Sequence, residues 1–159
     1  MNAKAIIEYG NKSFLKALDG VSLEIVEKAG ACGVWSIKDI LAHITKYEEL
    51  FIEVFQGQLD EGMTVPTLVR MGNDHGKFNE LGIDEGKQKT FDELKELYLS
   101  RFEKAVELVT KITPFQLRKV GTIPWYGKEY ALDDLIVYLN YGHKREHGAQ
   151  IALFKEIYR

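Results

Sequence analysis

The sequence predicts an all-α protein, an antiparallel four-helix bundle with a longer crossover between its second and third helices. Four long segments repeat apolar residues with the period of an α-helix, and the alternation typical of strands is nearly absent. The three prolines, Pro66, Pro114 and Pro124, lie outside these segments and therefore separate helices instead of kinking them. Because the 159 residues contain no internal repeat, we expect a single domain over residues 1–159.

The first helix is expected from Ala3 to Leu18, and it stops at the turn-forming pair "DG". A short helical stretch is also expected after Ser22, in "SLEIVEKAG", before the glycine-rich "AGACGV". The apolar residues that define the first helix lie at helical spacing and are Ile6, Ile7, Phe14, Leu15 and Leu18.

The second helix has the clearest start signal in the chain. Ser36 is the expected N-cap, and Asp39 at the third helical position completes a capping box. Trp35 is expected to pack onto Ile40 as a hydrophobic staple, and the helix should run to about Phe55. Its apolar positions form a wide buried face of two rows, namely Ile37, Leu41, Ile44, Phe51 and Phe55, and Ile40, His43, Tyr47, Leu50 and Val54.

Residues 57–89 are predicted to form the crossover. Helix formers are interrupted there by Gly72, Gly76 and Gly82, which favours a short or broken helix flanked by loops. The apolar repeat of this segment consists of Leu68, Met71, Phe78 and Leu81.

The third long helix is expected from Thr90 to about Lys111. Thr90 and Glu93 have the spacing of a full capping box. A further helical turn is expected to start with Pro114 at its first position. The inward positions of the third helix are Leu94, Leu97, Arg101, Ala105, Leu108 and Val109.

The last long helix is expected from Leu132 to near the C-terminus, after a loop or short extended segment, "VGTIPWYGKEYAL". The helical period places two histidines in the middle of its buried stripe. The stripe consists of Leu132, Leu135, Ile136, Leu139, His143, His147, Gln150, Phe154 and Tyr158.

Composition narrows the function. The net charge is -3, the pI is near 5.8 and no Lys/Arg run is longer than "HKR". These features disfavour electrostatic binding to nucleic-acid phosphates, so nucleic acid is not an expected partner. The N-terminus lacks the features of a signal peptide, and no apolar run approaches the roughly 18 to 20 residues that span a bilayer. We therefore expect a cytoplasmic protein without a membrane partner. The single cysteine, Cys32, is interpreted as a small loop residue.

The histidines are the strongest chemical signal. His143 and His147 are four residues apart, so their side chains project from one helix face closely enough to bind one divalent ion. Buried imidazoles need polar partners, and a shared metal ion satisfies both. His43 lies in the buried face of the second helix and is the candidate third ligand. Three nitrogen ligands with open positions are typical of a catalytic or substrate-binding metal site.

Other residues are weaker candidates. His75 is either a fourth ligand or substrate contact at the pocket mouth, or a solvated loop histidine. Glu48 is a candidate general base, and Glu146 is interpreted as a carboxylate behind the ligands or on the surface. Trp125, with Tyr126 and Tyr130, either walls a pocket or packs a loop on the bundle end. The expected substrate-binding residues are His75, Asn79, Trp125 and Tyr47.

The segments "VWSIKDILAHITKYEE" and "NYGHKREHGAQI" resemble the DinB-like superfamily, which includes the ClbS/DfsB-type four-helix bundle proteins. The tryptophan followed eight residues later by histidine matches Trp35 and His43. The last helix with HxxxH, a small residue and "QI" matches His143 and His147. "DHGKFNE" is similar to an Asp/Phe-Asn segment of the family and contributes Asp74 and Asn79. The resemblance covers nearly the whole chain, and Gly142 and Gly148 around the ligand segment depart from it.

This resemblance implies a divalent metal ion, most often zinc or nickel, held by His43, His143 and His147 at one end of the bundle. It implies a metal-dependent hydrolase or thiol-dependent transferase acting on a small molecule in detoxification or stress response, with a low-molecular-weight thiol as an expected co-substrate. Because the family often forms dimers, a homodimer is an expected assembly. Two alternatives stay open: a non-enzymatic protein that binds or sequesters a small molecule in the same bundle-end pocket, and a plain structural bundle.

Overall fold

The computed structural model of the chain describes residues 1–60 and 65–159. The described residues form helices and contain no strand apart from one isolated bridge between Cys32 and Trp35. No helix among them is both long and apolar enough to cross a membrane. The elements are α1 (Ala3–Leu18), α2 (Ile37–Leu59), α3 (Thr67–Arg70), α4 (His75–Lys87), α5 (Phe91–Val109), α6 (Pro114–Arg118), α7 (Leu132–Leu135), the π-helical η1 (Ile136–Gly142) and α8 (His143–Ile157).

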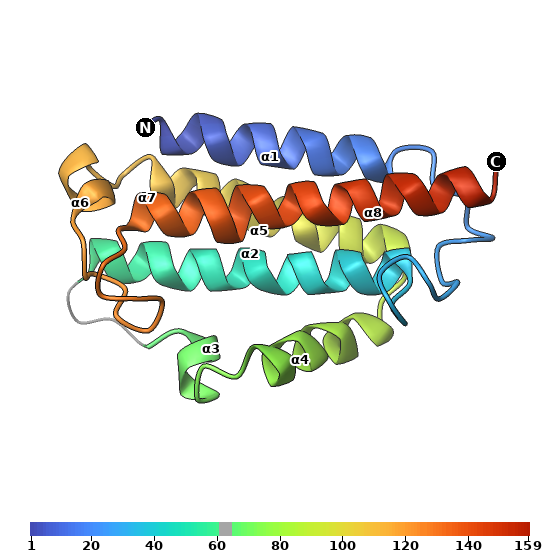
Figure 1. Cartoon of the computed structure of the whole chain (residues 1–159), viewed down its shortest axis with the longest axis horizontal. Helices are drawn as coiled ribbons and strands as arrows, with labels where there is room; N and C mark the ends of the chain where they lie inside the picture. The colour runs from blue at the N-terminus through green and yellow to red at the C-terminus, as the bar shows by residue number, and fades with distance from the viewer. Residues whose placement is uncertain (61–64) are drawn as a thin grey trace.

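The expected four-helix bundle is confirmed. It consists of α1, α2, α5 and the continuous run of α7, η1 and α8, while α3 and α4 lie on the outside of α2 (Figure 1). The colour gradient shows α1 and α8 running in one direction and α2 and α5 in the other. The crossover through α3 and α4 returns the chain to the end at which α2 began, so α5 lies parallel to α2. Residues 61–64 of the predicted crossover lie outside the described residues.

Helix capping positions α2 and α5 as expected. Ser36 and Asp39 form a reciprocal capping box at the start of α2, and Thr90 and Glu93 form another at the start of α5. Each box satisfies backbone N–H groups that the first helical turn leaves without a partner. Pro114 occupies the first turn of α6. The short helix expected after Ser22 does not form, because residues 23–27 make only turns.

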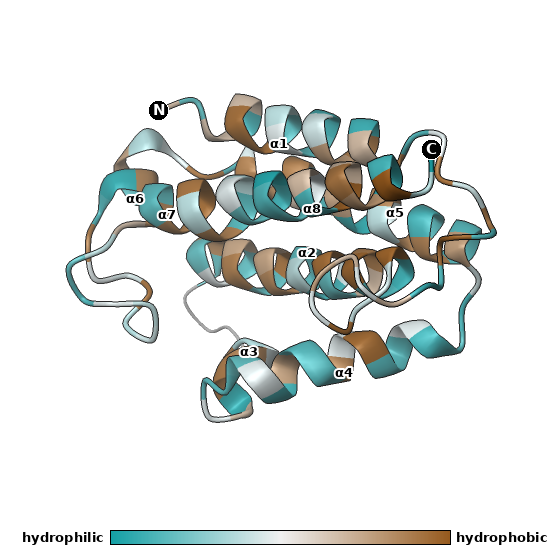
Figure 2. Cartoon of the chain, turned by 45° about the vertical axis from the view of Figure 1, so that its right-hand side comes forward, coloured by the Kyte–Doolittle hydropathy of each residue, from teal (hydrophilic) through white to brown (hydrophobic). Residues whose placement is uncertain are grey.

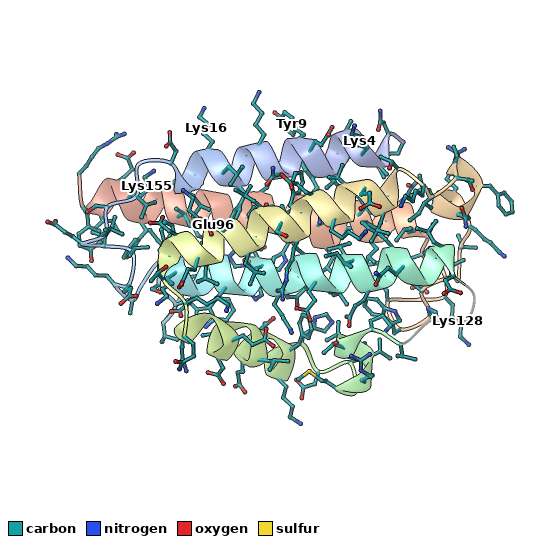
Figure 3. The ribbon with its side chains drawn as sticks, turned by 180° about the vertical axis from the view of Figure 1, so that it is seen from behind. Lys4, Tyr9, Lys16, Glu96, Lys128 and Lys155 are labelled. Atoms are coloured by element: carbon teal, nitrogen blue, oxygen red, sulfur yellow. The ribbon has the colours of Figure 1, made fainter. Side chains whose placement is uncertain are left out.

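The apolar faces of the helices meet in the centre of the bundle. The buried rows predicted for α2 are correct, and the outward faces of α1 and α4 carry hydrophilic residues (Figure 2). Lys4, Tyr9 and Lys16 point away from α1 into solvent (Figure 3). On α5, Tyr98 is fully buried although the sequence pattern did not single it out. The largest buried apolar side chains are Tyr98, Phe14, Phe51, Phe55 and Phe78.

The glycines of the crossover have two different roles. Gly72 ends α3 with φ of 76°, and Asn73 beside it has φ of 57°, so the expected break lies there. Gly82 and Gly86 instead lie inside α4, where they allow it to approach α2 closely. A Cβ atom at Gly86 would lie 2.4 Å from the Cβ of Ala42. The expectation of a broken helix is therefore correct, but of the three glycines named for it Gly76 and Gly82 lie inside α4 and do not break it.

The last long helix contains a π-helical segment that the sequence pattern did not predict. In η1 the hydrogen bonds run between residues i and i+5 instead of i and i+4, so its turns are wider than those of an α-helix. Gly142 closes this segment, and a Cβ there would lie 3.2 Å from the carbonyl oxygen of Val137. Asn140, inside this segment, and Lys144, just after it, are buried, while Tyr158, expected to be buried, is 45% exposed at the C-cap of α8.

Candidate metal centre

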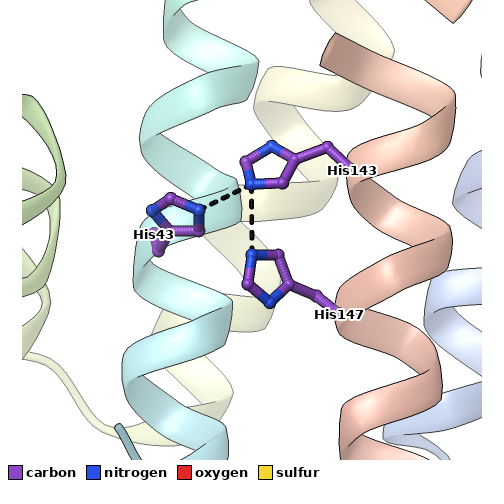
Figure 4. A group of neighbouring side chains, drawn as sticks. All are labelled: His43, His143 and His147. Carbon is purple, nitrogen blue, oxygen red and sulfur yellow. Dashed lines mark hydrogen bonds between the residues drawn. The ribbon is translucent and has the colours of Figure 1, made fainter. Parts of the chain in front are cut away.

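Three histidines from two helices meet between α2 and α8 (Figure 4). His43 projects from α2, and His143 and His147 project from consecutive turns of α8. The Nε2 atom of His143 lies 2.8 Å from Nε2 of His43 and 3.1 Å from Nε2 of His147. Their candidate ligand atoms all lie within 4.8 Å of one another. The fold therefore brings together three residues that are up to 104 positions apart in the sequence (147 − 43).

Hydrogen bonds among the three histidines cannot satisfy all three Nε2 atoms. A neutral imidazole nitrogen either donates one hydrogen or accepts through one lone pair. Nε2 of His143 contacts two other Nε2 atoms, so a hydrogen on it can serve only one of them, and a lone pair accepts poorly from two directions. A cation between the three nitrogens would bind all three lone pairs at once. This arrangement of donors fits a divalent metal ion.

Burial keeps the imidazoles in the form that binds metal. Burial, followed by the nearby His143 and His147, lowers the pKa of His43 to about 2. Burial and His147 also lower the pKa of His143 to about 3, against the effect of the Leu139 carbonyl. Burial lowers the pKa of His147, and Gln150 opposes this shift. At neutral pH all three rings are neutral, as metal ligation requires.

The two nitrogen-to-nitrogen distances that involve His143 are close to those of a zinc site. Zn–N bonds of about 2.0–2.1 Å in tetrahedral geometry separate ligand nitrogens by about 3.3 Å. The two Nε2 to Nε2 distances, 2.8 and 3.1 Å, need to open by only a few tenths of an ångström to reach this spacing. Three imidazoles suit Zn, Ni or Co, so the donor set does not by itself select one of them.

Neighbouring side chains orient the rings. Trp35 lies beside His43, with ring centroids 4.9 Å apart, and Tyr47 lies 4.6 Å from the ring of His143. Nδ1 of His147 lies 2.7 Å from the amide oxygen of Gln150. Nδ1 of His43 and of His143 has no hydrogen-bond partner among the described residues. His147 is thus the ligand whose orientation is best fixed.

Three of the four predicted substrate-binding residues lie together at the edge of the cluster. The Tyr47 hydroxyl donates to Oδ1 of Asn79 at 3.3 Å and lies 3.1 Å from Nδ1 of His75. His75 and Asn79 come from the first turns of α4, where Asp74 is the N-cap. The ring of Tyr47 is buried, and burial raises its pKa to about 12, so the hydroxyl keeps its proton. His75 itself is exposed, which gives this group a solvent-facing side.

Trp125 and Glu48 do not join this group. Trp125 lines a separate pocket of about 370 Å³ with Val54 and Pro66, and its carbonyl accepts from Asn73. Glu48 is 1% exposed and forms an ion pair with Lys144 in the core, so its carboxylate is already occupied by that ion pair. The helical period predicted where Glu48 lies on α2, but it did not predict that Lys144 of α8 is its partner.

Sequence reasoning missed Lys144 and Asn140. Lys144 stands in the charged run "HKREH", which is typical of a solvated helix face. In the structure it is 1% exposed, and Asn140 is also 1% exposed. Asn140 and Lys144 lie four and eight residues after the buried Ile136, so the helical period places them beside the buried stripe, and only their polar character argued against burial. This spacing was the available signal, and the ion pair with Glu48 that allows a lysine to be buried is visible only in three dimensions.

Solved structures share this fold. A crystal structure of a protein from Streptococcus pneumoniae superimposes with a TM-score of 0.82 at 15% identity, covering 98% of this chain and 89% of that one. The colibactin self-resistance protein ClbS, in complex with a double-stranded DNA, superimposes with a TM-score of 0.71 at 13% identity, covering 97% of this chain and 94% of that one. At these identities the likeness establishes the fold. No protein in the curated set matches the chain by sequence.

The comparison with ClbS corrects one expectation. Nucleic acid was excluded as a partner from the acidic composition and the lack of a basic run. ClbS has the same fold and is in complex with double-stranded DNA, so the exclusion is wrong. Its physical weakness is that net charge averages over the whole surface, whereas contact with phosphates depends on the local charge of one face.

The family follows from the sequence itself. A model of the DinB superfamily matches residues 7–151, which include most of α1, all of α2, the crossover and the part of α8 that carries His143 and His147. The match agrees with the helical bundle and with the resemblance of the two histidine segments. The chain therefore belongs to the DinB superfamily.

Proposed function

We propose that the protein binds one divalent metal ion, zinc or nickel, through Nε2 of His43, His143 and His147. The observation that carries this proposal is the meeting of three Nε2 atoms, from the buried His43 and His147 and the half-buried His143, that cannot satisfy one another with protons. A metal ion held this way supplies a Lewis acid and lowers the pKa of a bound water or thiol. Trp35 and Tyr47 shield the ligands from solvent.

The reaction that we propose is hydrolysis of a small molecule or transfer of a low-molecular-weight thiol to it. Tyr47, His75 and Asn79 are the proposed substrate contacts, because their polar groups meet at the solvent-facing edge of the cluster. Trp125 stays a weaker candidate, since it lines another pocket. The neighbour ClbS is a self-resistance protein, which supports a role in detoxification or stress response. A single domain, a homodimer and a cytoplasmic location stay predictions.

The alternative is a protein that binds a small toxic compound without turning it over. The resistance role of ClbS is compatible with this function as well as with catalysis. The same edge, with Tyr47 and Asn79, would then bind one molecule of compound per chain.

The test is the metal content of protein purified without an affinity tag. We expect about one zinc or nickel per chain by elemental analysis, lost in His43→Ala and in His147→Ala. His75→Ala is the matched control, because His75 lies outside the three-histidine group and should leave the metal in place. Wild-type protein that stays metal-free after dialysis against Zn²⁺ and Ni²⁺ would overturn the proposal.

Turnover separates the two functions. Metal-loaded protein is incubated with a large excess of a thiol and a small electrophile, or of an ester or amide substrate. Many products per chain, lost in His43→Ala, support the enzyme. Binding of one equivalent with no product supports sequestration.

A further inference from the structure

A buried ion pair lies next to the histidines. Nζ of Lys144 is 2.6 Å from Oε1 of Glu48, and each side chain is 1% exposed. The ammonium also lies 5.6 Å from the ring centroid of Tyr98 and 5.3 Å from that of Phe102, both on α5. A lysine and a glutamate are almost never this deeply buried unless they are paired. The pair therefore needs a physical reason beyond general stability.

The pair crosses the same helix interface as the candidate metal ligands. Lys144 directly follows His143 on α8, and Glu48 is five residues from His43 on α2. Because α2 and α8 run in opposite directions, the part of α8 that lies opposite Glu48 is N-terminal to His143, where Asn140 lies, and the long side chain of Lys144 reaches back to it. The ion pair and the three histidines are consecutive contacts between these two helices.

Asn140 ties the pair to the π-helical segment. Its Nδ2 donates to Oε1 of Glu48 at 3.2 Å, and its Oδ1 accepts from Nζ of Lys144 at 3.3 Å. Asn140 lies in η1, just before the histidines. Asn140 and Lys144 are both buried, while His143 and His147 lie against His43 of α2. Three polar side chains therefore fix both the rotation and the height of α8 at the ligands.

Stability alone does not explain this network. A buried ion pair can often be replaced by apolar residues of similar size without loss of stability, because removing two charges from water is costly. Oε2 of Glu48 also has no partner among the described residues. A directional polar contact can in addition fix the register between two helices, as a single buried asparagine does in coiled coils.

We propose that Lys144 and Glu48, bridged by Asn140, are positioning residues of the metal centre. They hold α8 against α2 in the register that makes Nε2 of His143 and His147 meet Nε2 of His43. This inference rests on the proposed metal function, which it deepens. It also changes the role of Glu48, from a candidate general base to a group that acts through the placement of the ligands.

The first experiment replaces the network with apolar side chains. The triple variant Glu48→Leu, Asn140→Leu, Lys144→Met is expected to keep its helical circular dichroism. Its Zn²⁺ affinity, measured by competition with a chromophoric chelator, should fall roughly 10- to 100-fold, as is typical when groups behind the ligands are lost. The absorption bands of bound Co²⁺ should shift, because the ligand geometry changes.

Two further variants sharpen the result. Glu48→Gln with Lys144→Met keeps an amide pair between Gln and Asn140 across the helices, so we expect Zn²⁺ affinity near that of the wild type. Lys46→Met is the matched control. Lys46 is also a buried lysine, but it lies on α2 and pairs with Glu49 and with Glu85 of α4, away from α8. It should change stability and leave Zn²⁺ affinity unchanged.

The outcomes are distinct. Wild-type protein that binds no Zn²⁺ overturns the proposed function and this inference with it. Wild-type protein that binds Zn²⁺, with a folded triple variant that binds it equally tightly, overturns the inference alone. If the triple variant does not fold, Glu48→Asp decides, because it shortens the carboxylate by one methylene and keeps the charge. Unchanged Zn²⁺ affinity and Co²⁺ bands in folded Glu48→Asp would also overturn the inference.

Discussion

Gln150 fixes the tautomer of one candidate metal ligand, His147. Its amide oxygen can only accept a hydrogen bond, so Nδ1 of His147 carries the hydrogen and Nε2 presents its lone pair to the other histidines. An oriented ligand with a fixed tautomer loses less freedom when it binds a metal ion. For His43 and His143, packing against Trp35 and Tyr47 supplies the orientation instead.

We therefore expect Gln150→Leu to weaken Zn²⁺ binding about tenfold, because His147 loses the acceptor that holds its Nδ1–H. Chelator competition measures the affinity. Gln88→Leu, the same change at the exposed end of α4, is the control and should have no effect. Equal Zn²⁺ affinity in the two variants would show that Gln150 does not orient the ligand.

At the scale of elements, the approach of α4 to α2 depends on glycine. Gly82 and Gly86 face Lys46 and Ala42 on α2, and a Cβ atom at either position would lie closer than two carbon atoms can come. Close contact places the first turns of α4, with His75 and Asn79, over Tyr47. Gly148 on α8 differs, because a Cβ there would meet Ala17 at an ordinary 3.7 Å.

This difference predicts opposite effects for the same substitution. Gly86→Ala should lower the free energy of unfolding by about 1–3 kcal/mol, because the methyl group overpacks the interface between α2 and α4. Gly148→Ala should be neutral or should raise it by up to about 1 kcal/mol, since alanine favours the helix. Urea denaturation of the two variants measures this. A loss in Gly148→Ala as large as in Gly86→Ala would contradict the packing argument.

For the whole molecule, the neutral histidines link stability to pH. In the metal-free fold, burial holds the pKa of His43 at about 2 and that of His143 at about 3, against 6.5 in the unfolded chain. Below pH 6.5 the unfolded chain takes up protons that the fold cannot accept. The unfolded state is then favoured, so stability is complete above pH 6.5 and falls progressively as the pH drops toward 3.

We expect the free energy of unfolding of the chelator-treated protein to fall between pH 6.5 and 5.5 by up to about 1.4 kcal/mol for each of these histidines. Urea denaturation at pH 7.5, 6.5 and 5.5 measures it. His43→Gln with His143→Gln should remove most of this slope. Added Zn²⁺ should raise the stability of the wild type at pH 7.5, because it binds only the folded chain. A pH-independent wild type in this range would refute the linkage.

The sequence by itself determined the helices and the face on which the histidines lie. The capping boxes at Ser36 and Thr90 are local hydrogen bonds within four residues, and the 3.6-residue period placed His43 among the buried positions of α2. These features depend on neighbours in the chain, so a pattern in the sequence can predict them. The same period suggested that His143 and His147 face the core together.

Only the tertiary structure decided what those side chains meet. Lys144 and Asn140 are buried, although their polar character and the charged run around Lys144 suggest a solvated face. The partner of Glu48 and the separation of Trp125 from the histidines were equally invisible to the pattern. Contacts between helices depend on the rotation and height of each helix relative to the other, and no local hydrogen bond or helical period fixes these.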